Sequence, residues 1–189
     1  MIINYLINII INKIPDLLVT IFGVFIGGIL TFGVAKWQIS KQSKLELERD
    51  YELLKLLFNR VKLEIRDNKN TLTNLREVLG SSRHARVDVF VWADKVADSI
   101  SFEAYNKLKD SGLHRKLDIK IENEIYTSYK MTDEIFNMVK ASLYKVKFYY
   151  GYGKGQEEID KVLNDLKVHL NTVNDHLIYS INLLNNYNL

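Results

Sequence analysis

The sequence predicts an all-α protein in which an N-terminal transmembrane helix continues into an up-and-down bundle of three long helices and one short helix. Two observations support this fold class. Leu17 to Ala35 contains no charged residue, and most of the chain beyond it carries apolar residues at helical spacing. The single proline, Pro15, precedes the apolar stretch, so no proline ring interrupts a later helix.

Residues 1–15 are expected to form a separate interfacial segment. Asn4, Asn8 and Asn12 recur every four residues, so they share one face of a helix among apolar neighbours. The segment is too short to cross a bilayer, which favours a helix lying in the outer interface and ending at Ile14-Pro15. A gate or plug is the alternative.

Residues 16–36 are predicted to be the transmembrane helix. Nineteen uncharged residues, at about 1.5 Å of rise each, cover roughly the 30 Å hydrocarbon thickness of a bilayer. Asp16 bounds the stretch on one side and Lys36 with Trp37 on the other, as expected at headgroup level. The run is longer than the apolar region of a cleaved signal peptide.

The flanking charges predict the orientation of this helix. Lys36, Lys41 and Lys44 follow it without an intervening acid, whereas Lys13 and the terminal amine precede it. The positive-inside rule then places the N-terminus outside and residues 37–189 in the cytoplasm, beneath an inner (plasma) membrane. The absence of cysteine agrees with a reducing compartment. The net charge of +3 suits an anionic lipid surface and is too small for a dedicated nucleic-acid binder.

Small residues form a strip along the predicted transmembrane helix. Its members are Thr20, Gly23, Gly27, Thr31 and Ala35. Such a strip lets helix backbones approach closely in lipid, which predicts a homo-oligomer. The same face can instead line a narrow apolar pore that closes by dewetting. Glycine is also common in membrane helices for other reasons.

The first bundle helix is predicted to be continuous with the membrane helix and to reach Gly80. Its apolar positions step by three and four and are Leu47, Tyr51, Leu54, Phe58, Val61, Ile65, Leu72, Leu75 and Leu79. Asn68 is the polar member of this series. It either sets the register against a neighbouring helix or lies at a wet margin.

The remaining elements follow from capping residues and spacing. Residues 86–92 are expected to form an extended connection, and Ser101 to cap a short helix that Gly112 ends. A long helix is then expected over residues 113–150 and another over 157–186, joined by a glycine-rich turn at 151–155. Their apolar stripes are Leu117, Ile121, Ile125, Thr132, Ile135, Val139, Leu143 and Val146, and Ile159, Leu163, Leu166, Leu170, Val173, Leu177, Ile181 and Leu184.

The loop after the first bundle helix is a candidate ligand site. Arg83, His84 and Arg86 place three cationic or ionisable groups within four residues. They can hold an anionic or nucleotide signal, or an acidic protein partner, by charge-assisted hydrogen bonds. Arg76 and Lys154 are possible helpers. The alternative is an ordinary solvated loop.

Catalytic and metal motifs are absent from the sequence. His169, His176 and Asp165 share a helix face but lack the spacing of a metal-binding motif, so polar residues at a helix edge are the preferred interpretation. No nucleophile elbow or phosphate-binding glycine loop accompanies them. The expectation is a protein without catalytic residues, metal or cofactor.

Three segments carry a resemblance to a known class. They are VKLEIRDNKNTLTNL (Val61 to Leu75), FEAYNKLKDSGL (102–113) and IYTSYKMTDEIFNMV (125–139). Together with the single span, they resemble small single-pass membrane-anchored helical-bundle effectors of bacterial anti-phage defence. The resemblance implies a cytosolic sensor domain coupled to a membrane-disturbing helix, and it carries over no site residues.

The sequence therefore predicts a homo-oligomeric membrane effector. Its bundle senses a signal, and its transmembrane helices form a channel or a membrane-disrupting assembly. The alternative is a passive membrane-anchored adaptor that binds a cytosolic protein.

Overall fold

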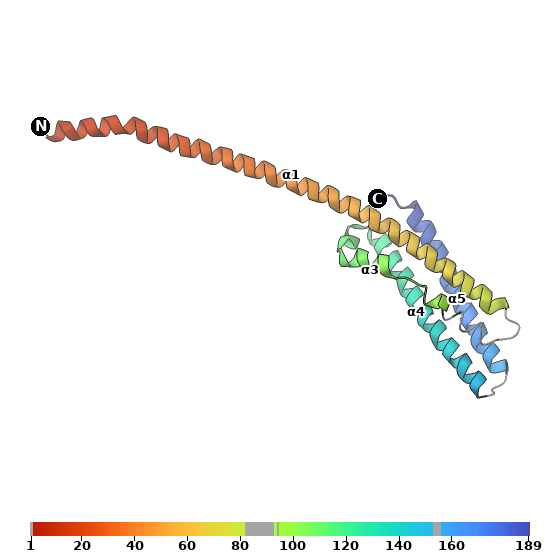
Figure 1. Ribbon diagram of the computed structural model, residues 1–189. Coiled ribbons are helices and arrows are strands. Elements are labelled where there is room, and N and C mark those ends of the chain that lie inside the picture. Colours follow the sequence, from red (N-terminus) through yellow and green to blue (C-terminus); the bar gives the residue numbers. More distant parts are fainter. Residues whose placement is uncertain (1, 82–92, 94, 153–155) are drawn as a thin grey trace. The chain divides into compact units, whose positions relative to one another are not determined.

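A computed structural model describes residues 2–81, 93, 95–152 and 156–189. Every regular element within these ranges is helical, as predicted, in the order α1 (Ile2–Ser81), α3 (Glu103–Asp110), the 3₁₀ helix η1 (Leu113–Lys116), α4 (Ile119–Gly151) and α5 (Gln156–Asn186) (Figure 1). The predicted extended connection at 86–92 and the turn residues 153–155 lie outside the described residues. By packing, the chain divides into two units, Met1–Tyr51 and Glu52–Leu189.

Helix α1 is continuous from Ile2 to Ser81 and contains Pro15. The prediction that a separate helix ends at Ile14-Pro15 was therefore wrong. A proline removes one backbone donor, and that loss can be accommodated by local adjustment within a long helix. The side chains of Asn4, Asn8 and Asn12 are not among those described, so their shared face stays a prediction.

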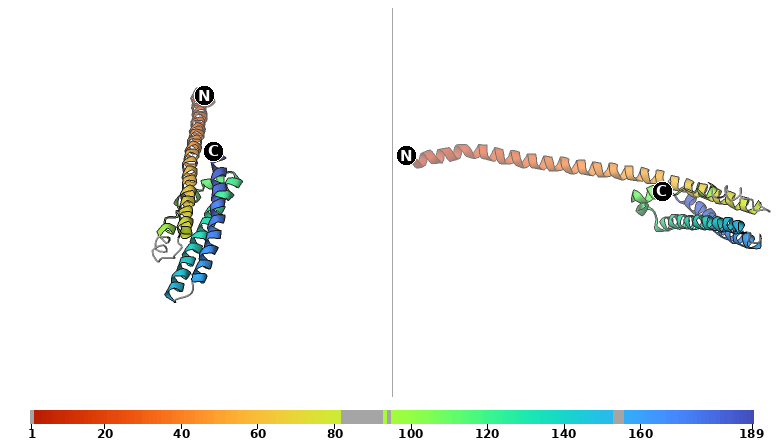
Figure 2. Two further views of the ribbon diagram at one scale, coloured as in Figure 1. Left: turned by 90° about the vertical axis from the view of Figure 1, so that its right-hand side faces the viewer. Right: turned by 60° about the horizontal axis from the view of Figure 1, so that its bottom comes forward.

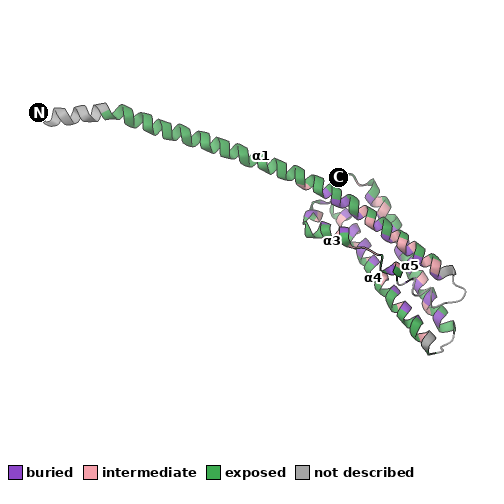
Figure 3. Cartoon of the chain, viewed as in Figure 1, coloured by how far each residue is buried: buried purple, intermediate pink, exposed green. Residues whose placement is uncertain are grey.

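The core of the second unit begins on α1 at Leu54. From there the predicted seam is buried through Leu79, whereas its first two members, Leu47 and Tyr51, are exposed (Figure 3). The predicted stripes of α4 and α5 are also buried, apart from Ile181, which is half-buried. The apolar periodicity thus identified the core-facing side of each long helix.

Side-chain pairs define the relative directions of these helices. Thr73 of α1 bonds to Asn174 of α5, and Arg76 bonds to Asn171, so residue numbers rise along one helix as they fall along the other. Ser128 of α4 bonds to Ser180 of α5. Helices α4 and α5 lie side by side in each view of Figure 2. The bundle is therefore up-and-down, with α5 antiparallel to both other long helices.

Two predicted helix starts need correction. The helix expected from Leu113 begins at Ile119, because η1 and the extended residue Leu117 come first and the Asp118 carboxylate then accepts a hydrogen bond from the Lys120 N–H (2.8 Å). Gly112 ends the preceding helix as predicted, with a left-handed φ of 70° that glycine adopts without strain. The N-cap position of α3 is Phe102, one residue later than predicted, although the Ser101 hydroxyl accepts a hydrogen bond from the Glu103 N–H (3.3 Å).

Candidate functional site

The predicted transmembrane segment is the apolar part of α1. Residues 13–49 are all exposed, and their large apolar side chains include Phe22, Val24 and Phe25 at 62 to 73% exposure. By length and composition this helix can cross a membrane. Apolar surface of this extent calls for lipid or other helices as its surroundings.

The small-residue strip of this helix is uncovered. A Cβ atom added at Gly23 or Gly27 would meet no heavy atom within 4 Å. The hydroxyls of Thr20 and Thr31 donate to the carbonyl oxygens of Asp16 and Gly27, each at 2.8 Å. The strip, which Ala35 completes, therefore presents a shallow face whose hydroxyl donors are already satisfied within the helix.

Trp37 and Lys41 mark one end of the apolar segment. The Lys41 ammonium lies 5.2 Å from the centroid of the Trp37 ring, a cation–π arrangement. An amphipathic indole beside a lysine is the combination expected at headgroup level.

The predicted anion-binding loop falls in a part of the chain that the structure does not describe. Arg83, His84 and Arg86 lie outside the described residues, as does Lys154. Arg76 is described, and its guanidinium donates to Asn171 Oδ1 at 3.2 Å. The loop therefore stays a sequence-based prediction.

The histidine face on α5 does not form a metal cluster. His169 is exposed, whereas His176 packs beside α4 with its Nε2 atom 3.4 Å from Glu124 Oε1. No group of three potential metal-binding side chains occurs in the part of the chain that the structure describes.

Ser180, His176 and Glu124 resemble a catalytic triad in composition but differ from one in geometry. Ser180 is fully buried, and its hydroxyl donates to the Glu124 carboxylate. The same imidazole nitrogen, Nε2, faces both the serine and the glutamate, so the ring does not bridge them as a catalytic histidine does. This polar layer joins α4 to α5.

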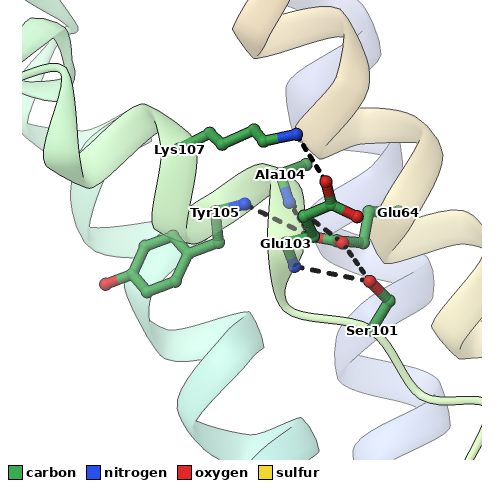
Figure 4. A network of polar contacts seen from close by, with 6 residues as sticks. All are labelled: Glu64, Ser101, Glu103, Ala104, Tyr105 and Lys107. Carbon is green, nitrogen blue, oxygen red and sulfur yellow. Dashed lines mark hydrogen bonds and ion pairs between the residues drawn. The ribbon is translucent and has the colours of Figure 1, made fainter.

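A polar cluster around Glu64 joins three helices and was not predicted from the sequence. The Glu64 carboxylate of α1 accepts hydrogen bonds from the backbone N–H groups of Ala104 (3.1 Å) and Tyr105 (3.2 Å) at the start of α3, and from the Ser101 hydroxyl (2.6 Å) (Figure 4). The Tyr129 hydroxyl of α4 donates to it at 2.5 Å. Glu64 thus caps a helix that lies about forty residues away in sequence.

Asn68 lies one turn after Glu64 and pairs with the connection before α3. Its amide donates to the Ser101 carbonyl (2.8 Å), and its carbonyl accepts from the Ser101 N–H (3.0 Å). Asn68 is 2% exposed. Of the two predicted roles, the wet margin is excluded, and the residue positions a connecting segment.

The cluster perturbs the ionisation of nearby groups. Burial raises the pKa of Tyr129, and the hydrogen bond to the Glu64 carboxylate raises it further. Its ring stacks on that of Tyr105, with centroids 4.5 Å apart. The Lys107 ammonium, by its hydrogen bond and charge, lowers the pKa of the exposed Glu103 carboxyl.

The one sequence signal of this cluster was Glu64, an acidic residue beside the α1 seam and one helical turn before Asn68. Its partners could not be found by spacing, because they come from a connection, a short helix and α4. The cluster fixes α3 against α1 and α4.

A scan against protein-family models matches none, and searches of curated proteins and of solved structures also find no match. The class of the protein therefore rests on its own features. These are a helical bundle and, among the residues that the structure describes, one helix able to span a membrane.

Proposed function

We propose that this protein is a homo-oligomeric, single-pass membrane effector. Its transmembrane helices pack through the strip from Thr20 to Ala35 and form a channel or a membrane-disrupting assembly. The observation that supports this most directly is the uncovered apolar length of α1 with small residues along one face.

The continuity of α1 supports an effector over a passive anchor. The helix that carries the apolar stretch is the same helix that supplies Glu64, Asn68 and the seam of the bundle. A signal received by the bundle can therefore act on the membrane segment through an unbroken helix. A tether needs no such continuity, and a flexible joint would serve it equally well.

The expected location is the inner (plasma) membrane, with the N-terminus outside and the bundle in the cytoplasm. Lys36, Lys41 and Lys44 support this orientation. The partners proposed are membrane lipid, further copies of the chain, and a cytosolic protein or an anionic or nucleotide signal bound by the loop of Arg83, His84 and Arg86. A role in anti-phage defence rests on the resemblance of layout.

A vesicle leakage assay tests the proposal. The full chain is reconstituted into dye-loaded vesicles containing anionic lipid, and is expected to release the dye as its surface density rises, because oligomers form by mass action. The control is the full chain with residues 17–35 in scrambled order, so that the composition of the segment is unchanged. Vesicles that stay tight at every density, with the protein correctly inserted, would favour the membrane-anchored adaptor.

A further inference from the structure

The end of α4 carries an exposed row of aromatic side chains. Tyr144, Phe148 and Tyr152 recur every four residues, and the Tyr152 N–H donates to the Phe148 carbonyl (3.2 Å), so the three lie along one side of the helix. They are 72, 47 and 72% exposed, and the ring centroids of Phe148 and Tyr152 are 4.5 Å apart. Exposed aromatic side chains that lie together are typical of surfaces that bind another protein.

Two lysines border this aromatic row. At about 100° of rotation per residue, Lys147 lies on one side of the row and Lys145 on the other. Both are exposed, and neither is in an ion pair within the described ranges, whereas Lys140, one turn earlier, is paired with Asp98 at 2.8 Å. No acidic residue occurs from 135 to 155. The end of α4 is therefore an aromatic face with positive borders.

The start of α5 has the opposite charge. Residues 156–168 include four acidic residues and two lysines. Asp160 and Asp165 lie on either side of a line through Asn164 and Val168, and all four are exposed, Val168 at 62%. Asp160 accepts a hydrogen bond from the Gln156 amide (3.0 Å), and neither aspartate is in an ion pair with any other residue that the structure describes. This acidic face has the borders that the aromatic face lacks.

The two faces lie at the same level along the antiparallel pair of α4 and α5. Ser128 of α4 bonds to Ser180 of α5, and counting equally along both helices from this contact brings Phe148 level with Asp160. Each face is on the side of its helix opposite the buried apolar stripe. The two faces therefore point outward and do not cover each other within one chain.

We propose that the aromatic face at the end of α4 docks on the acidic face at the start of α5 in a second copy of this chain. Lysines on both borders of one face meet aspartates on both borders of the other, and this charge complementarity selects the occupant. The contact joins two different surfaces, so it can repeat from copy to copy around a ring. It is small, and it rests on the proposed function, in which the membrane helices already hold the copies together.

Single cysteines test the contact, because the chain has none of its own. Ala141→Cys on the aromatic face and Val168→Cys on the acidic face are placed in two differently tagged full chains, at exposed positions of nearly equal level. When the two chains are mixed in vesicles and oxidised, the 141–168 disulfide is expected to exceed the 141–141 and 168–168 disulfides at least roughly tenfold. A 141–168 yield no higher than that of the two self-pairs would overturn the proposal.

Charge reversal shows whether these borders make the contact. Lys145→Glu with Lys147→Glu, or Asp160→Lys with Asp165→Lys, introduced into both chains, should each lower the 141–168 disulfide at least roughly tenfold, because like charges then face each other. All four substitutions together should restore it. A fourfold variant that links no better than the double variants would contradict docking between these two faces.

Lys109→Glu with Lys120→Glu is the matched control, since it reverses two exposed lysines away from both faces and should leave the 141–168 yield unchanged. Circular dichroism checks that each variant folds. Ala35→Cys reports the contact of the membrane helices separately. An Ala35→Cys disulfide without a 141–168 disulfide would overturn the bundle contact and leave the membrane proposal intact, whereas the reverse result would support the bundle contact and contradict the strip.

Discussion

Glu64 holds the first turn of α3 although it belongs to another helix. Its carboxylate receives two backbone donors and two side-chain hydroxyls, from Ser101 and Tyr129. The first turn of a helix leaves backbone donors unpaired and is electrically positive, so an anion placed there satisfies both requirements. One residue thereby joins α1, α3 and α4.

Replacing Glu64 by Gln should destabilise the bundle by about 1–3 kcal/mol, because the neutral amide turns one of its ends from acceptor to donor and leaves buried N–H or hydroxyl groups unpaired. Chemical denaturation of the detergent-solubilised chain measures the change. Glu134→Gln is the control, since Glu134 is exposed and faces Lys130 at 3.9 Å. Equal stability of the two variants would show that Glu64 does not stabilise the packing of α3 against α1.

Tyr129 predicts a stability change at alkaline pH. Its pKa is raised in the folded state above the ordinary value of 10.0. The folded chain therefore keeps a proton that the unfolded chain releases, so this contribution to stability is complete below pH 10 and declines as the pH rises further. Tyr129→Phe should show a weaker decline than the parent in unfolding experiments above pH 10. Parallel curves for the two chains would contradict the assignment.

At the level of elements, α1 combines two environments in one helix. Its apolar segment is exposed over residues 17–35, whereas its later part carries a seam that is buried from Leu54 to Leu79. The period of the seam is close to seven residues in two turns, as in coiled coils, so one side of the helix stays against α4 and α5.

Leucine at Gly23 or Gly27 should break association of the membrane helices while leaving insertion intact. Leucine suits lipid and holds neighbouring backbones apart, and a Cβ atom added at either position meets no heavy atom within 4 Å. Crosslinking in vesicles measures the oligomer. Gly33→Leu is the control, because residue 33 is equally open and lies outside the strip, roughly 140° around the helix from its centre. Unchanged oligomers in both test variants would exclude the strip as the contact face.

For the whole molecule, the proposed transmission depends on the continuity of α1. No glycine occurs between Lys36 and Leu79, and the helix is unbroken through both units. A continuous helix bends only gently along its length, whereas a flexible linker can bend at any residue.

A short Gly-Ser insert after Gln42 should abolish permeabilisation while oligomerisation and bundle folding persist, because the two parts then move independently. Dye release and crosslinking are measured on the same vesicles. A seven-residue helix-forming insert at the same place is the control, since about two helical turns preserve both stiffness and facing. Undiminished dye release with the Gly-Ser insert would contradict transmission through α1.

The sequence alone determined the helices and their buried sides, because apolar periodicity and capping are local properties of the chain. The stripes of α4 and α5 and the α1 seam from Leu54 followed from spacing. Local rules were insufficient at Pro15, where a long helix tolerated one missing donor, and at Leu113, where η1 intervened.

Only the tertiary structure decided the polar contacts. Glu64 and Tyr129 are 65 residues apart, and Ser128 and Ser180 are 52 apart, so their pairing depends on how the helices pack. Long-range polar contacts leave no periodic signal in a sequence, because each is satisfied by one particular partner, whereas a helix face is repeated every turn.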